Sequence, residues 1–407
     1  MARWLPCAKA IVGTTIVLVA AVGSASAGGT DGIPGRSIST TGPVLALAAD
    51  GTTVAAVIGS KTSVCGEQVV IWDTRRETPT VMRRKSECRP SELADGGLAI
   101  AVGGRMVGAI RFSSDHAVES KLSVTRIPTS GRWTDITGVY DYEYGAGEGD
   151  YLSVLGDGPI LAFDKWTLCY VYDAGDTCPG VSKGGGWWVS NGQLVQVRPP
   201  GSKGPLVPCP RLSGEDNGMG IPWGLAVVKA CRRIGSGAGF VRAVSLDRGR
   251  FLTLPPKGRV TIVDANSGDV TELPIQTSSV RQADLDGTSV VILPRGRAGI
   301  PVLEVRDAST GALRRTWPLS RLPIKASSIE LEDAHSGIAV YRIGTTIHLL
   351  RITDGKSHTI PIPTNEGPVH SRLEDAGLTY SYNNIKGAES RGRIEFVSAA
   401  QLVAQLR

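Results

Sequence analysis

Acidic residues recur in the second half of the sequence beside short apolar runs. Seven of them lie at or next to the expected first hairpin of consecutive repeats: Asp284, Asp286, Glu330, Glu332, Asp333, Glu374 and Asp375. Carboxylates that ring one end of a channel would suit Ca²⁺ or a cationic partner, whereas ordinary hairpin charges would only face water. The candidate channel-mouth acids are therefore Asp284, Asp286, Glu330, Glu332, Glu374 and Asp375. We assign no catalytic or metal-ligating residue and expect no cofactor, with Ca²⁺ as the alternative.

Aromatic residues are concentrated in residues 133–223, which hold five of the eight tryptophans and six of the nine tyrosines. Tyr140, Tyr142 and Tyr144 alternate, so that in a strand they would share one face. Rings on disulfide-held loops can stack on sugars or anchor proteins; the alternative is packing between repeats. The candidate ligand-binding residues are Trp133, Tyr140, Tyr142, Tyr144, Trp166, Trp187, Trp188 and Trp223.

Catalytic motifs are missing from the sequence. It contains no G-x-S-x-G elbow, no H-E-x-x-H, no Walker loop and no EF-hand spacing. The five histidines are scattered, with His348 inside an apolar run and His335 at the expected end of a strand. A binding module needs no catalytic set, so this function is favoured over an enzyme.

Residues 1–27 have the pattern of a secretory signal peptide. Arg3 and Lys9 precede an apolar run from Ile11 to Val22, and Ala25-Ser26-Ala27 forms a small-residue cleavage site. The run is shorter than the roughly 20 residues of a membrane-spanning helix. Removing the two basic residues lowers the net charge from +6 to +4, which does not favour nucleic acid. We expect a secreted, extracytoplasmic protein without stable membrane insertion.

Six cysteines remain after residue 27: Cys65, Cys88, Cys169, Cys178, Cys209 and Cys231. Six cysteines allow about fifteen pairings, and the nearest neighbours in sequence favour Cys65–Cys88, Cys169–Cys178 and Cys209–Cys231. None has C-x-x-C spacing, so structural disulfides of an oxidising compartment are favoured over a metal site. Each would stabilise the fold by about 2–4 kcal/mol.

These residues would lie on short strands that are arranged in groups of four. Within residues 241–274, four apolar runs are separated by Asp247-Arg248-Gly249, Pro255–Gly258 and Asp264–Asp269, which are turn sequences. One such meander cannot bury both of its faces, so it requires neighbours of the same kind. Acid–Gly turns recur 39 to 47 residues apart where repeats are contiguous. The spacing predicts an all-β protein, a single β-propeller of four-stranded antiparallel blades.

Seven blades fit the sequence best, with eight or six as alternatives. We expect the propeller over residues 44–398, with 199–239 as a disulfide-stapled insertion or an extra blade. Residues 28–43 precede it, and a strand near Arg36–Thr40 would complete the last blade. Residues 399–407 form a C-terminal tail.

The segments VLALAADGTTVAAVIG, YLSVLGDGPILAFDKWTLC and LEDAGLTYSYN…GRIEFVS resemble the repeats of secreted bacterial TolB-like and WD40-like propellers. The pattern is similar to that of uncharacterised exported actinobacterial proteins. The resemblance implies a monomeric module that binds a protein or glycan outside the cytoplasm. A metal-assisted hydrolase, lactonase or glycan lyase with its site over the channel remains an alternative, as does an envelope assembly accessory. Fold alone does not decide between them.

Overall fold

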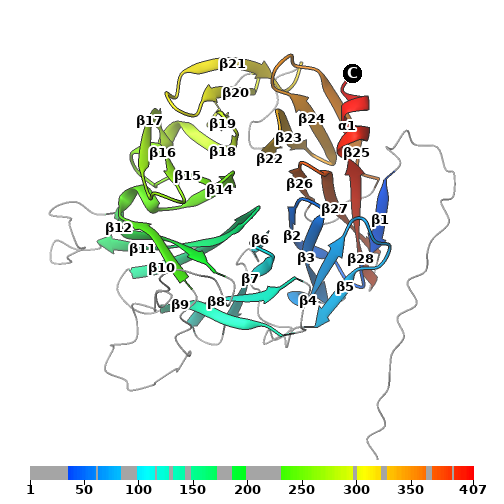
Figure 1. The fold of residues 1–407 in the computed structure, drawn as a ribbon, viewed down its shortest axis with the longest axis horizontal. Coiled ribbons are helices and arrows are strands. Elements are labelled where there is room, and N and C mark those ends of the chain that lie inside the picture. Colours follow the sequence, from blue (N-terminus) through cyan, green and yellow to red (C-terminus); the bar gives the residue numbers. More distant parts are fainter. Residues whose placement is uncertain are drawn as a thin grey trace, which may run out of the picture. The chain divides into compact units, whose positions relative to one another are not determined.

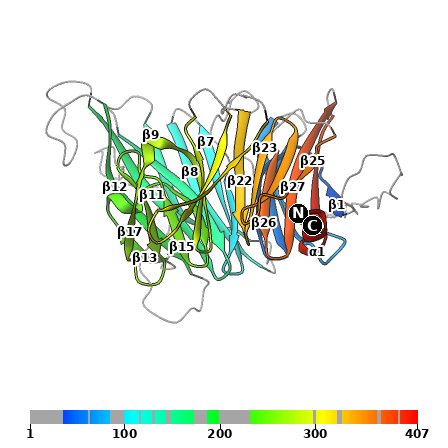
Figure 2. The same ribbon diagram turned by 90° about the horizontal axis from the view of Figure 1, so that it is seen from above.

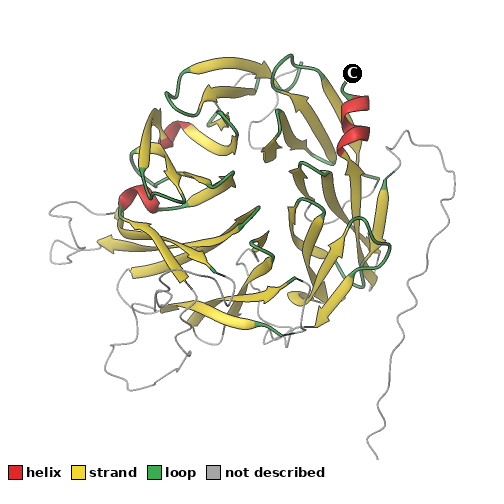
Figure 3. Ribbon diagram, viewed as in Figure 1, coloured by secondary structure: helices red, strands yellow, loops and turns green. Residues whose placement is uncertain are grey.

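Seven four-stranded antiparallel sheets surround a common axis in the computed structural model, and together they form a seven-bladed β-propeller (Figure 1). Almost all of the regular structure is strand (Figure 3). The structure describes residues 35–60, 63–83, 99–114, 117–127, 132–142, 148–171, 186–198, 231–296, 300–321, 328–363, 369–386 and 389–407. The predicted fold class and the preferred blade number are confirmed.

Blades 1 to 4 follow one another along the chain. Blade 1 contains β2 (Val44–Asp50), β3 (Thr53–Ser60), β4 (Ser63–Asp73) and β5 (Thr80–Arg83). Blade 2 contains β6 (Ile100–Gly103), β7 (Met106–Ser114), β8 (Ala117–Arg126) and β9 (Thr134–Tyr142). Blade 3 contains β10 (Glu148–Asp157), β11 (Ile160–Val171), β12 (Gly186–Val197) and β13 (Cys231–Ser236). Blade 4 contains β14 (Ala243–Asp247), β15 (Arg250–Thr253), β16 (Arg259–Asp264) and β17 (Val270–Gln276).

The remaining blades complete the circle. Blade 5 contains β18 (Val280–Asp286), β19 (Ser289–Pro294), β20 (Val302–Asp307) and β21 (Leu313–Pro318). Blade 6 contains β22 (Ile329–His335), β23 (Ile338–Ile343), β24 (Thr346–Arg351) and β25 (Ser357–Pro361). Blade 7 contains β26 (His370–Glu374), β27 (Gly377–Lys386) and β28 (Glu389–Ser398), with β1 (Arg36–Ser39) as its fourth strand. Two short 3-10 helices, η1 (Ala238–Phe240) and η2 (Thr277–Ser279), and the helix α1 (Ala399–Gln405) are the other elements.

The N-terminal strand β1 closes the propeller, as predicted. It pairs antiparallel with β28, so that Arg36 lies opposite Phe396 and Ile38 opposite Ile394. The first and last parts of the chain therefore share one sheet (Figure 1). Closure of this kind removes the exposed strand edges that would otherwise pair with other chains.

The hydrophobic core is divided into seven clusters among the described residues, one in each interface between neighbouring blades. For example, Leu252 of blade 4 packs with Leu285 and Val290 of blade 5. Each sheet therefore buries its two faces against two different neighbours. A single four-stranded meander cannot bury both of its faces, and packing between two neighbours meets this requirement.

The first strands of consecutive blades contact one another around the whole circle, from β2 through β6, β10, β14, β18, β22 and β26 back to β2. They are the innermost strands. Figure 2 shows the same blades from the side, with β22 and β26 among them. Side chains at the ends of these strands thus lie nearest the axis.

One local expectation differs from the structure. In the sequence, Asp95-Gly96 fits the acid–Gly pattern of a first hairpin, but it lies outside the described residues, and the innermost strand of blade 2 is β6, which turns at Gly104-Arg105. This turn has no acid, so the acid–Gly pattern pointed to the wrong place. In blade 3 the outermost strand is β13, which pairs with β12. Residues 199–230 lie between these two strands in the sequence and are outside the described residues.

The C-terminal tail contains a helix that sequence periodicity did not reveal. Ser398 caps α1 through a capping box with Gln401. Leu402 and Leu406 are buried in the cluster between blades 6 and 7. No helix in the described ranges combines the length and the apolar content needed to cross a membrane.

Candidate functional site

The innermost strand ends in an ionisable residue in six of the seven blades. These residues are Asp50, Asp157, Asp247, Asp286, His335 and Glu374, and we call them the axial ring. The seventh position, at the end of β6, is Gly103. A tight turn follows each strand, and Gly51, Gly158 and Gly287 have the positive φ that such turns require. Consecutive ring residues are 39 to 107 positions apart in the sequence, and they meet at one end of the axis, which we call the turn end.

Each acid of the ring accepts a hydrogen bond from a backbone N–H in the turn of a different blade. Asp157 accepts from Arg248 at 2.6 Å, Asp247 from Gly287 at 2.7 Å, and Asp286 from Gly337 at 2.8 Å. The carboxylates thus link successive blades. This differs from the common arrangement in which the acid of a turn bonds to its own local backbone. The local arrangement does occur in the outer turns, where Asp264 and Asp307 accept from nearby N–H groups.

Blade 2 contributes no ionisable side chain to the ring, and a hydrogen bond links blades 1 and 3 directly. Asp50 of blade 1 accepts from the N–H of Gly158 in blade 3 at 3.1 Å. Blades 2 and 3 approach so closely that a Cβ on Gly103 would lie 1.9 Å from the carbonyl oxygen of Ile160. Glycine is therefore required at this point. On the other side, Glu374 of blade 7 accepts from Gly51 at 3.5 Å.

A second tier of hydrogen bonds lies two residues before the ring in three blades. Ser245 Oγ accepts from the N–H of Leu285 at 3.1 Å, Asp284 from Ala334 at 2.8 Å, and Asp333 from Leu373 at 2.7 Å. Each bond runs from one blade to the next. Asp284 is therefore a residue of the interface between blades 5 and 6.

Three acids of the ring crowd together. One carboxylate oxygen each from Asp50, Asp157 and Glu374 lies within 4.8 Å of the others. Burial raises the pKa of Asp50 and of Asp157. Burial also raises the pKa of Glu374, with the negative charges of Asp333, Asp50 and Asp157, to about 9. Oxygen atoms in this arrangement are of the type that hard cations prefer. Each group already accepts a backbone N–H, however, and we assign no metal to them.

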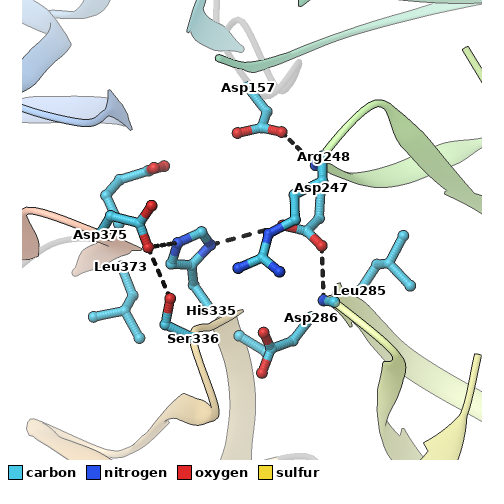
Figure 4. A network of polar contacts seen from close by, with 12 residues as sticks. Asp157, Asp247, Arg248, Leu285, Asp286, His335, Ser336, Leu373 and Asp375 are labelled. Atoms are coloured by element: carbon cyan, nitrogen blue, oxygen red, sulfur yellow. Dashed lines mark hydrogen bonds and ion pairs between the residues drawn. The ribbon is translucent and has the colours of Figure 1, made fainter.

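The other side of the ring contains a histidine and an arginine. The Nε2 atom of His335 lies 2.9 Å from Oδ1 of Asp375, and its Nδ1 atom lies 3.9 Å from Oδ1 of Asp247 (Figure 4). The Ser336 hydroxyl also donates to Asp375, at 2.8 Å. These two hydrogen bonds lower the pKa of Asp375. The guanidinium of Arg248 projects into the same group, with Nε 3.9 Å from Oδ1 of Asp247.

The candidate acids from the sequence fall into three groups. Asp286 and Glu374 belong to the axial ring, and Asp375 lies beside it on the β26–β27 turn. Asp284 is buried between blades. Glu330 and Glu332 lie toward the beginning of β22, and Glu330 is five residues, about 16 Å, from the turn end. Both accept hydrogen bonds from Arg342 there. The structure therefore does not bring these two glutamates to the ring.

The aromatic candidates are only partly within the described residues. Trp133 is half-buried against the cluster between blades 1 and 2, and Trp166 is half-buried on β11. The backbones of Tyr140 and Tyr142 lie on β9, and those of Trp187 and Trp188 on β12, but their side chains are outside the described residues. Tyr144 and Trp223 lie outside altogether. The aromatic recognition surface stays a prediction.

The predicted signal peptide and most cysteine side chains also lie outside the described residues. Cys231 is fully buried and its sulfur is engaged in a disulfide, whose partner is not among the described side chains. The three proposed pairings stay predictions.

Sequence reasoning missed Asp50, Asp157, Asp247 and His335 as members of one site. The recurrence of acid–Gly turns was the signal that could have identified the ring, because the acids of these turns occupy equivalent positions in different blades, and such positions meet at the axis. His335 occupies the same position, but no acidic pattern could have included it.

The comparisons with known proteins carry no argument about the function of this chain. No protein-family model matches the sequence, and no curated protein matches it. Among solved structures, the chain is similar to the β-propeller domain of Cps50 (Swd1) from *Myceliophteria thermophila*, with 14% identity, a TM-score of 0.44, and coverage of 90% of this chain and 100% of that one. BamB from *Moraxella catarrhalis* gives 13% identity, a TM-score of 0.37, and coverage of 87% and 85%.

PorZ, described as a surface component of the type-IX secretion system of *Porphyromonas gingivalis*, gives 14% identity and a TM-score of 0.40. The match covers 88% of this chain but 39% of PorZ. At this level of similarity the likeness is one of architecture, and the site must be interpreted from its own residues.

Proposed function

We propose that this propeller is a binding module that acts outside the cytoplasm and takes a basic segment of a protein partner at the turn end of its axis. Export is inferred from the signal-peptide pattern of residues 1–27. The ligand class is inferred from the axial ring, where the carboxylates of Asp50, Asp157, Asp247 and Asp286 face one end of the axis.

The observation that carries the proposal is the position of Arg248. Its guanidinium projects among the ring residues (Figure 4), next to the buried Asp247. The positive charge of Arg248 also acts on Asp157, Asp286 and Asp375. Its side chain remains 62% exposed, so an arginine or lysine from a partner could take its place. The position of Arg248 thus supports a guanidinium or ammonium as the group that this surface accepts.

The exposed edge of the ring supports a protein ligand over a small ion. Asp375 is 79% exposed on its hairpin, so a segment that enters the ring would meet a further carboxylate at the rim. Charge complementarity of this kind governs association rate and partner choice more than affinity. The binding should therefore weaken strongly as salt is raised.

The test is binding of a labelled arginine-rich peptide to the mature, oxidised protein at low and high salt, with a citrulline peptide of the same length as the neutral control. Asp286→Asn removes a ring carboxylate that is only 7% exposed, and it should weaken binding by about fivefold, which corresponds to roughly 1 kcal/mol for one ion pair. Asp354→Asn, on an outer turn, is the matched control and should bind like the wild type. Equal binding of both peptides, or equal binding by the two variants, would contradict the proposal.

Calcium chloride is titrated separately by calorimetry. A saturable heat that disappears in Asp50→Asn would show that the ring takes a metal ion, and would overturn the assignment to a basic segment.

A further inference from the structure

His335 joins parts of the axial ring that are not neighbours in the circle of blades. It belongs to blade 6, whereas Asp375 is in blade 7 and Asp247 is in blade 4. The imidazole therefore reaches past blade 5 and lies across the turn end (Figure 4). Its side chain is only 13% exposed, and that of Asp247 only 4%.

We propose that His335 is a proton-dependent latch across the turn end of the propeller axis. An imidazolium has an N–H on both nitrogens and can donate toward Asp375 and Asp247 at the same time. A neutral imidazole has one N–H and one lone pair, so one of the two carboxylates then faces a lone pair. Loss of the proton therefore removes one side of the bridge between blades 4 and 7.

The charges around His335 favour the closed form when the proton is present. Asp247 and Asp375 contact it, and the carboxylates of Asp157 in blade 3 and Asp286 in blade 5 also act on it. The opposing cation is Arg248, which is largely exposed. These five groups come from blades 3, 4, 5 and 7, so the imidazole is approached by acids from four other blades.

The N–H of Gly287 reports whether the latch is closed. It donates to Oδ2 of Asp247, the carboxylate whose other oxygen faces His335. When the latch opens, Asp247 loses a contact and this hydrogen bond becomes easier to break. The reporter depends only on the protein, so the result is independent of whether a basic partner exists.

The experiment is amide hydrogen exchange of the mature protein, followed by NMR at about pH 5 and about pH 8, the range in which an imidazole changes charge. After correction for intrinsic exchange, the protection of Gly287 in the wild type should fall by roughly fivefold at the higher pH, as expected for one ion pair. His335→Gln keeps one donor toward Asp375 but cannot become charged. Its protection should be low and nearly the same at both pH values.

The matched control is His358→Gln, on β25 and outside the ring, which should keep the wild-type response. If His335→Gln does not fold, Asp375→Asn serves instead, because Asp375 lies on an exposed hairpin; it should lower protection at about pH 5 only. A wild-type protection that does not change with pH, or a change that survives in His335→Gln or Asp375→Asn, would overturn the latch. Loss of peptide binding with an intact latch response would contradict only the proposed function.

Discussion

The carboxyl groups of Asp284 and Asp333 meet between the inner strands of blades 5 and 6. Both accept the N–H of Ala334, at 2.8 and 2.9 Å. Burial, together with the negative charge of Asp333, raises the pKa of Asp284 well above its usual range. The fold therefore resists ionisation of Asp284.

Because the pKa of Asp284 is raised in the fold, the propeller becomes less stable as pH rises. The pKa of Asp284 is higher in the folded than in the unfolded chain, so stability falls once the pH exceeds about 4, the unfolded value. Asp284→Asn keeps an oxygen for Ala334 and supplies an N–H toward Asp333. We expect Asp284→Asn to unfold at a higher urea concentration than the wild type at about pH 8. Its stability should also decrease less than that of the wild type as the pH rises.

Asp307→Asn is the control with the opposite sign. Hydrogen bonds from Ser309 and Arg314 lower the pKa of Asp307, so its carboxylate stabilises the fold above the usual carboxyl pKa and less so in acid. This variant should be less stable than the wild type at neutral pH. If the wild-type loss of stability with rising pH persists unchanged in Asp284→Asn, the fold does not resist ionisation of Asp284.

Glu374 should behave in the same way as Asp284. Its pKa of about 9 lies above the usual glutamate value of 4.5, so ionising it in the fold costs stability progressively between these values. Between pH 4.5 and 7 the loss is at most about 3 kcal/mol, at about 1.4 kcal/mol per pH unit. Glu374→Gln retains an oxygen acceptor for Gly51 and should flatten this part of the stability curve.

Urea unfolding from about pH 4 to about pH 9 checks this prediction. The neighbouring Asp375→Asn is the control, because Asp375 is exposed and its pKa is lowered, not raised. Asp375→Asn should lose stability with rising pH in the same way as the wild type. An identical decline in Glu374→Gln and the wild type would show that the three crowded acids do not resist ionisation.

The sequence was sufficient for the architecture because blades are local. The meander of residues 241–274 contains its own turn sequences, and the structure places β14 to β17 there. Closure by β1 also followed from a simple requirement, since the last repeat had one strand too few. Blade 2 was misplaced because Gly103-Gly104 replaces the acid–Gly turn, and the reason is a tight contact with blade 3 that only the assembled ring creates.

The site could be predicted only in part because its bonds are not local. Asp157 was correctly placed at a turn, but the N–H that it accepts belongs to Arg248, which is 91 residues away. Glu330 and Glu374 both appeared to lie beside first hairpins, yet they occupy opposite ends of their strands. Distinguishing them requires the position of each residue along the strand, which a count of acids does not provide.

Closure of the circle depends on a short strand with one buried side chain. Ile38 is 8% exposed and packs with Ile394 and Val44 in the cluster between blades 7 and 1. Ile38→Ala should lower the free energy of unfolding by about 2–4 kcal/mol, as for other large-to-small core changes. Ser39→Ala, at the neighbouring exposed position, should have little effect. Equal unfolding midpoints for the two variants would mean that β1 contributes little to closure.

Gly103 tests the close approach of blades 2 and 3. A Cβ there would meet the Ile160 carbonyl oxygen at 1.9 Å and the backbone N of Asp157 at 2.9 Å, and backbone atoms cannot rotate away as a flexible side chain would. Gly103→Ala should therefore cost about 1–3 kcal/mol, the usual range for overpacking. Gly158→Asn is the control, because a Cβ at Gly158 meets nothing within 4 Å and asparagine tolerates its φ of +49°. Thermal unfolding of the two variants compares them directly. If Gly103→Ala is as stable as Gly158→Asn, blades 2 and 3 can separate at this point. The hydrogen bond from Gly158 in blade 3 to Asp50 in blade 1 then does not depend on the contact between blades 2 and 3.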